Sequence, residues 1–84
     1  PAGISLFPSP FRDNLFIEAP APGAEVSVRI YDSTGRLLWR RDSRSSQDSW
    51  SGIWTPSGGD GPGVILVRLQ SGGTVCTGKA VLLR

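Results

Sequence analysis

The chain alternates between apolar and polar residues over short runs, and no helical periodicity persists along it. Clusters of Pro, Gly, Asn, Asp and Ser separate the runs, which is typical of an all-β domain. The pattern predicts seven strands, over residues 4–7, 14–19, 25–31, 36–41, 50–54, 63–70 and 74–83. We expect the polar stretch over residues 42–48 to be the most mobile connection.

The run over residues 25–31 shows the clearest alternation, because Val26, Val28 and Ile30 take turns with three polar or amphipathic residues. A period of two places these two sets on opposite faces of a strand. The sequence Asp-Ser-Thr-Gly at residues 32–35 then suits a type I turn followed by a glycine at positive φ. We therefore predict a tight turn between this strand and the next.

The last two strands are expected to form a hairpin around Gly72 and Gly73, which suit the positive φ angles of a primed turn. In this register Ile65 faces Ala80, and a slip by one residue would place Lys79 on the core face, which is costly. The predicted core face consists of apolar or small residues: Ile65, Val67, Leu69, Cys76, Gly78 and Ala80. The predicted outer face consists of Val64, Leu66, Arg68, Gln70, Val75, Thr77, Lys79, Val81 and Leu83.

Four apolar residues fall together on this outer face, near the C-terminal end of the hairpin: Val64, Leu66, Val81 and Leu83. They form either an exposed apolar patch or a surface that a bulge or a neighbouring loop covers. The alternation alone leaves both possibilities open.

Short strands around an alternating apolar core predict an immunoglobulin-like antiparallel β-sandwich of about seven strands. The Cys–Trp–Cys hallmark of antibody domains is absent, so only the architecture is implied. With 84 residues the chain is expected to form a single domain, residues 1–84, without a large internal cavity. It starts at Pro1 with no signal peptide and has no apolar stretch of membrane length, so we interpret it as a module cut from a longer protein.

The composition offers little support for catalysis. The chain has no His, so its hydroxyl groups lack a base that works near neutral pH. Cys76 is expected to be a small core hydrophobe, and Lys79, the only lysine, is expected to point outward. The carboxylates are scattered, and no spacing aims two of them at one bond. We therefore predict no catalytic residues and a protein that is not an enzyme.

Metal and cofactor binding find no better support. One Cys and no His argue against a zinc site. The glycine-rich residues 57–63 offer one carboxylate, whereas calcium takes about six to eight oxygen ligands. This stretch also lacks the lysine and the following helix of a phosphate-binding loop. We predict a simple connecting loop, no metal site and no cofactor.

Nucleic-acid binding is not indicated by the charges. The net charge of +2 is modest, and a nucleic-acid surface needs a larger basic patch. Arg40, Arg41 and Arg44 form a small basic cluster beside Trp39. We interpret this cluster as a solvated strand end.

Aromatic rings on the surface would be needed to stack on sugars. Trp50 and Trp54 share one face of a short strand, and we expect at least Trp54 to be buried in the core. This leaves Trp39 and Tyr31 as the more plausible surface rings.

Four motifs occur in a fixed order along the chain. They are Phe-Pro-Ser-Pro at residues 7–10, Ile-Tyr-Asp-Ser-Thr-Gly-Arg at residues 30–36, the glycine that opens the strand at residue 63, and a lysine followed by apolar residues and a basic end at residues 79–84. The marker residues of the first three motifs are Pro8, Pro10, Asp32, Gly35, Arg36 and Gly63. Those of the last motif are Lys79, Ala80, Val81, Leu82, Leu83 and Arg84.

In this order the motifs resemble the type IX secretion system C-terminal sorting domain, also called the Por secretion tail. They are also similar to the immunoglobulin-like module of flagellar hook-capping proteins. The resemblance covers residues 4–84, with Ser9 where sorting domains commonly have Asn and Ile65 where they commonly have Tyr.

The resemblance implies an address rather than an enzyme. It implies that the domain directs an upstream cargo through the periplasm and across the outer membrane of a Bacteroidota-type bacterium, to the cell surface or the medium. The implied partners are the outer-membrane translocon, a surface sortase and the cargo, without direct insertion into the membrane. Recognition in the family lies on the final strand, here residues 79–84, and we expect a free apolar face and a free edge there that add to a partner's sheet.

Two other functions stay open at this point. The domain could be a structural accessory module that packs against a catalytic domain of an extracellular enzyme, or a carbohydrate-binding module. An exposed hairpin edge would also permit a dimer.

Overall fold

The computed structural model describes residues 3–21, 25–44 and 48–83. Its strands are β1 (Ser5–Phe7), β2 (Leu15–Pro20), β3 (Glu25–Asp32), β4 (Leu37–Arg44), β5 (Ser49–Trp54), β6 (Gly63–Ser71) and β7 (Thr74–Leu82). These seven strands confirm the predicted all-β class, and their bounds differ from the predicted ones by at most three residues. Among the described residues, we find no helix with the length and apolar character needed to cross a bilayer.

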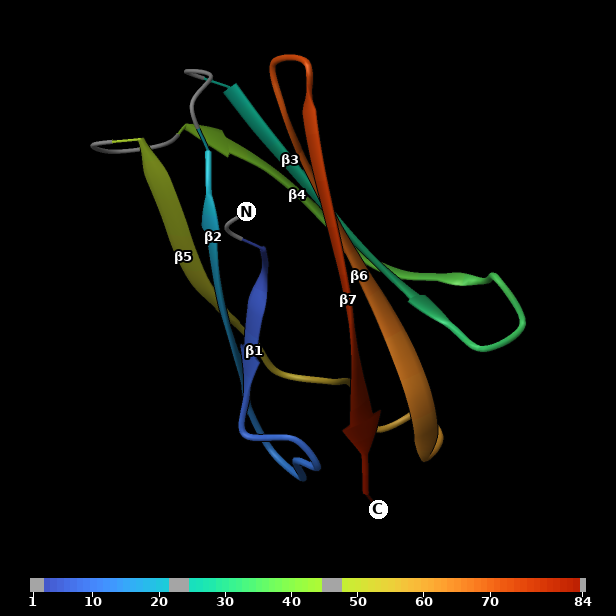
Figure 1. Cartoon of the computed structure of the whole chain (residues 1–84). Helices are drawn as coiled ribbons and strands as arrows, with labels where there is room; N and C mark the ends of the chain where they lie inside the picture. Colours follow the sequence, from blue (N-terminus) through green and yellow to red (C-terminus); the bar gives the residue numbers. More distant parts are fainter. Residues whose placement is uncertain (1–2, 22–24, 45–47, 84) are drawn as a thin grey trace.

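The strands form two antiparallel sheets that face each other as a sandwich (Figure 1). The smaller sheet has the order β1-β2-β5 and the larger has the order β4-β3-β6-β7. In the constant-type immunoglobulin sandwich the fourth strand belongs to the sheet of the first, second and fifth strands, whereas here it pairs with β3. The predicted immunoglobulin-like sandwich is therefore confirmed, as the variant with three and four strands.

The core lies between the sheets and follows the predicted alternation. On β3, Val26, Val28 and Ile30 are buried while their neighbours are exposed or half-buried. Trp50 and Trp54 of β5 are both buried, as expected for at least Trp54. The remaining buried apolar residues are Phe11, Leu15, Ile17, Ala19, Ala21, Ile65, Val67, Leu69, Ala80 and Leu82.

The β6–β7 hairpin has the predicted register. Leu69 lies opposite Cys76, Val67 opposite Gly78 and Ile65 opposite Ala80. Gly72 has a φ of 59°, as the first central position of a type II′ turn requires. Cys76 is half-buried, so its side chain lies at the margin of the core.

The polar stretch after the fourth predicted strand behaves differently from the expectation. Asp42–Arg44 belong to β4, which pairs with β3 as far as Arg44 opposite Glu25. The prediction ended this strand early because β4 is an edge strand with few buried positions, so the stretch lacks an apolar alternation. Residues 45–47 of the expected mobile connection lie outside the described residues.

Candidate recognition surface on the C-terminal strand

The segment over residues 79–84 is divided between surface and core, because it runs along β7 at the edge of the larger sheet. Lys79 and Val81 point outward, with 38% of Val81 exposed. Ala80 and Leu82 point inward and are 1% and 0% exposed. Leu83 is half-buried, and Arg84 lies outside the described residues.

The edge of β7 is closed at this end, so the expected free edge is wrong there. Phe11 forms an isolated parallel bridge with Leu82. Its N–H donates to the Val81 carbonyl at 2.8 Å, and its own carbonyl accepts the Leu83 N–H at 2.7 Å. The Val81 N–H in turn donates to Ser9 Oγ at 3.3 Å. We call residues 9–11 the strap, because they occupy the edge that a partner strand would need.

The strap is held in place by the side chain of Phe11. This ring is 2% exposed and meets Trp54 edge-on, with the ring centroids 6.1 Å apart. Pro8 and Pro10 of the first motif flank Ser9 and are exposed, and the peptide bonds that precede them are cis. The first motif thus lies directly against the last one, although they occupy opposite ends of the chain.

The second motif forms the turn between β3 and β4. Asp32 Oδ1 accepts hydrogen bonds from Thr34 N at 2.9 Å, Thr34 Oγ1 at 2.6 Å and Arg36 N at 2.9 Å. The Arg36 Nε lies 3.2 Å from Asp32 Oδ2. Gly35 has a φ of 90°, a region that favours glycine. Asp32, Gly35 and Arg36 therefore stabilise the turn that the sequence predicted.

The same contacts affect the acidity of the turn. The hydrogen bond from the Thr34 side chain, followed by the one from the Arg36 backbone, lowers the pKa of Asp32 below its usual value. The charge of Arg36 contributes in the same direction. Asp32 is therefore ionised under physiological conditions and acts as a fixed anchor of the turn.

Gly63, the third motif residue, opens β6 opposite Leu82. Its φ of 138° is one that residues with a side chain rarely adopt, while no atom lies within 4 Å of the place where a Cβ would be. The backbone conformation, and not crowding, accounts for the glycine.

Of the four apolar residues predicted on the outer face, Val64, Leu66 and Val81 lie on the outer face of the larger sheet, whereas the half-buried Leu83 lies beyond the end of β7, beside the strap. Val64 lies opposite Val81, and the next row across the strands runs from Tyr31 through Leu66 to Lys79. Leu37 of β4 lies opposite Tyr31. We call these residues the apolar patch: Tyr31, Leu37, Val64, Leu66 and Val81. The exposed fractions of Leu37 and Val64 are 48% and 46%, so no loop among the described residues covers them.

Part of the apolar patch lines a shallow depression of about 350 Å³. The row Tyr31–Leu66–Lys79 and the turn after β3 surround it. Its lining consists of Tyr31, Asp32, Ser33, Gly35, Val64, Leu66 and Lys79. The second and the last motifs therefore meet at one place on the surface.

A row of arginines follows the apolar patch on the same face. Arg29 of β3 lies opposite Arg40 of β4 on one side and Arg68 of β6 on the other. We call these three residues the arginine row. Sequence reasoning grouped Arg40 with Arg41 and Arg44 instead, because the pairing of β3 with β6 joins residues far apart in the chain.

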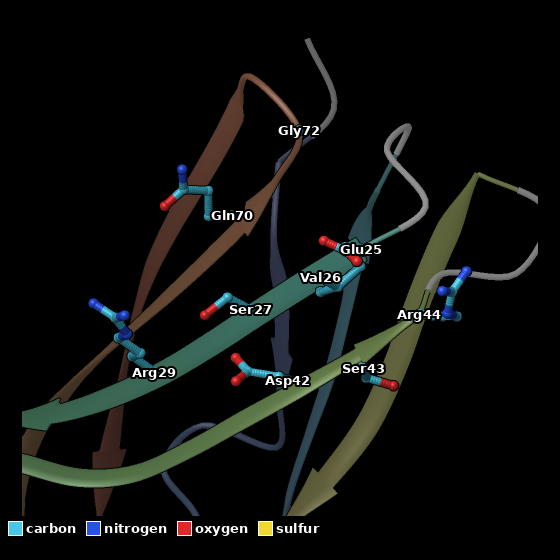
Figure 2. A pocket seen from close by; sticks show the side chains of 9 residues that line it. All are labelled: Glu25, Val26, Ser27, Arg29, Asp42, Ser43, Arg44, Gln70 and Gly72. Atoms are coloured by element: carbon cyan, nitrogen blue, oxygen red, sulfur yellow. The ribbon is translucent and has the colours of Figure 1, made fainter.

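An open polar groove of about 780 Å³ runs over the outer surface of β4, β3 and β6, and Arg29 of the arginine row lines it (Figure 2). Asp42 in this groove accepts a hydrogen bond from Arg40 at 3.0 Å. The hydrogen bonds from Arg40 and then Ser27 lower the pKa of Asp42 below its usual value. Figure 2 shows Ser27, Arg29 and Asp42 side by side on the same surface of the sheet.

The other sequence candidates for chemistry form no site in the described ranges. No group of three or more His, Cys, Asp or Glu side chains comes together there. In the glycine-rich loop, Asp60 Oδ2 accepts the Ser57 N–H at 2.9 Å, which makes the carboxylate part of a turn. The two candidate surface rings lie apart: Trp39 is half-buried and packs against the core, while Tyr31 belongs to the outer face.

One aromatic pair was missed by the sequence reasoning. Phe7 and Phe16 stack at 5.6 Å on the outer face of the smaller sheet, and Ile53 lies opposite Phe16. All three side chains are exposed. A period of two in β2 places Phe16 on this face, but the pairing of β1 with β2 was needed to bring Phe7 beside it.

Comparison with known proteins assigns the fold to a family. The profile of the family described as "Secretion system C-terminal sorting domain" matches residues 5–82, which is almost the whole chain. The chain therefore belongs to this family of type IX secretion C-terminal sorting domains. Searches of curated proteins and of solved structures each returned no match.

Domains of this family are sorting signals, and the family is not catalytic. Such a domain interacts with the type IX machinery, follows a cargo in the chain, and implies export to the cell surface or the extracellular space.

Proposed function

We propose that residues 1–84 form a single, non-catalytic C-terminal signal domain of a longer secreted protein of a Bacteroidota-type bacterium. The domain would pass through the periplasm with its cargo, bind the outer-membrane translocon, and then meet a surface sortase. It would insert into no membrane itself and need no metal or cofactor.

The observation that best supports this proposal is the position of the family's recognition segment. Lys79 and Val81 point outward on an edge strand, where Val81 is part of the exposed apolar patch and Lys79 borders it. Contiguous exposed apolar surface on a small protein is typical of a binding site. Three of the carboxylates accept hydrogen bonds from nearby groups: Asp32 from Thr34, Asp42 from Arg40 and Asp60 from Ser57.

A deletion of residues 81–84 is a poor test of this role. Leu82 is completely buried, and Leu83 donates a hydrogen bond to the strap. Removing these residues would open the core, so a loss of export would not separate recognition from folding. A substitution of an outward side chain is needed.

The test uses the whole chain fused behind a periplasmic fluorescent reporter, in a bacterium with a working type IX machinery. The wild-type fusion should appear at the surface or in the medium, and a strain without the translocon should retain it. Val81→Asp should retain the reporter as well. Val75→Asp is the matched control, because Val75 is also an exposed valine on the outer face of β7, at the opposite end of the strand.

Retention of the wild-type fusion with a folded domain would contradict the sorting role. It would favour the structural accessory module, and binding to polysaccharides would then be the next measurement. Export of Val81→Asp at the wild-type level would contradict the role of the terminal strand.

A dimer is part of the proposal only at the part of the β7 edge that the strap does not cover. The N–H and C=O groups of Val75, Thr77 and Lys79 point away from β6, toward the sheet edge, as those of Val81 do. These three residues lie beyond the strap. A second copy could add there, and a molar mass of 9.0 kDa at all concentrations in light scattering would exclude it.

A further inference from the structure

We propose that the type IX machinery reads a composite surface of the folded domain, made of side chains from β3, β4, β6 and β7, and not the backbone edge or the linear sequence of the last strand. This proposal rests on the sorting function proposed above. The surface is the apolar patch together with Lys79 and the arginine row. The partner it fits is a protein component of the machinery that presents an apolar area bordered by carboxylates.

Two of the three ways to bind the terminal strand are closed in the folded domain. The inward face is in the core, where Ala80 and Leu82 are 1% and 0% exposed. The edge at Val81 and Leu83 is occupied by hydrogen bonds of 2.8 and 2.7 Å to Phe11. Addition of a partner strand over residues 81–83 would require these bonds to break and the buried Phe11 ring to leave. Over residues 80–83, the outward side chains are therefore the part of the strand that a partner reaches without unfolding the domain.

These outward side chains do not stand alone. Val81 lies directly opposite Val64, and Lys79 lies directly opposite Leu66. Directly opposed side chains on one face of a sheet are about 4.5–5.5 Å apart at Cβ, so any partner that covers Val81 also covers Val64. Tyr31 continues the same row beyond Leu66. The binding surface therefore includes residues that precede the recognition segment by up to about fifty positions in the chain.

The charges around the apolar patch define the chemistry of the partner. Arginines placed directly opposite one another destabilise a sheet. Asp42 compensates part of this repulsion, because it pairs with Arg40 and its pKa is also lowered by the charge of Arg29. Within the described ranges the ion pairs are Arg36 with Asp32 and Arg40 with Asp42. Arg68 and Lys79 thus have no carboxylate within 4 Å in that part of the chain, and both are exposed. An acidic border on the partner would complement them.

The decisive variant is Val64→Asp in the reporter fusion, since Val64 lies outside the segment over residues 79–84. Val75→Asp is again the control, because Val64 and Val75 are both 46% exposed on the same face of one hairpin. A carboxylate at position 64 would be desolvated by an apolar partner, so we expect at least about tenfold less exported reporter. Val75→Asp should be exported at the wild-type level.

A second variant guards against misfolding. Arg68→Glu changes an exposed side chain, and its new charge faces Arg29, which favours the sheet. We expect it to lower export as well, with wild-type tryptophan emission showing that the domain is folded. Both variants should also bind the type IX machinery more weakly than the wild type does, and the variant with the lower export should show the weaker binding.

The outcomes separate this proposal from the sorting function. No export of the wild-type fusion would overturn both. Wild-type export together with normal export of Val64→Asp and Arg68→Glu would overturn the composite surface and leave the sorting function standing. A dimer of the wild-type domain that Val64→Asp converts to a monomer would also overturn it, because a second copy would then be the occupant of the face.

Discussion

Phe11 is the residue whose replacement tests the strap most clearly. Its ring is 2% exposed between the sheets, and its backbone closes the edge of β7 through two hydrogen bonds. Phe11→Ala should cost about 3–5 kcal/mol, the usual range for a buried Phe that leaves a cavity. A domain of this size has a free energy of unfolding of about 4–13 kcal/mol, so the loss is a large share of the total.

The chain provides a matched control at the other end of the same Pro-Ser-Pro stretch. Phe7 is 43% exposed, and its main contact is the stack with Phe16 at 5.6 Å. Losing such an aromatic pair costs about 0.5–1.5 kcal/mol. The sequence gives no reason to separate these two phenylalanines, since both flank the Pro-Ser-Pro of the first motif. The structure predicts that Phe11→Ala is several times more harmful than Phe7→Ala.

Urea unfolding measured by tryptophan emission is the assay, because Trp50 and Trp54 are buried and become solvated when the sandwich opens. With an m-value of about 1 kcal/mol/M, the midpoint should fall by about 3–5 M for Phe11→Ala and by about 1 M for Phe7→Ala. If Phe11→Ala is unfolded in buffer, Phe11→Leu should still show a lowered midpoint. Equal midpoints for Phe7→Ala and Phe11→Ala would refute the strap.

Two further predictions concern local features of the fold. Gly78→Ala should destabilise the domain by about 1–3 kcal/mol in the same urea assay, because the new Cβ would lie about 2.5 Å from Ile4 Cγ2, whereas Gly73→Ala meets no atom within 4 Å and should change little. The pKa of Asp32 is lowered by the hydrogen bond from Thr34, so its contribution to stability is complete above the unfolded-state pKa near 4 and is lost as the pH falls through the lower folded-state pKa. Asp32→Asn should therefore weaken the pH dependence of the unfolding midpoint below about pH 4, and an unchanged dependence would contradict the role of the turn carboxylate.

The sequence predicted the β6–β7 hairpin down to its register. The diglycine fixed the position of the turn, and any slip would have placed Lys79 on the core face. The Asp32 turn was equally predictable, because its hydrogen bonds join residues no more than four apart. Both features depend on neighbours in the chain.

The strap and the arginine row could not be predicted in this way. Phe11 follows two prolines outside any regular strand, and its partners lie about 70 residues further along the chain. The arginine row depends on the pairing of β3 with β6, two strands that β4 and β5 separate in the sequence. Of the features that the sequence did not predict, the strap matters most for function. It closes the backbone edge at residues 81–83, so that a partner meets the outward side chains there.

The sorting function and the composite surface are tested together by the export of the reporter fused to the whole chain, compared with Val64→Asp and Val75→Asp in the same strain. We expect surface or extracellular reporter that depends on the machinery, loss of export for Val64→Asp, and normal export for Val75→Asp. Periplasmic retention of the folded wild-type fusion would contradict the sorting function, and equal export of all three fusions would contradict the composite surface.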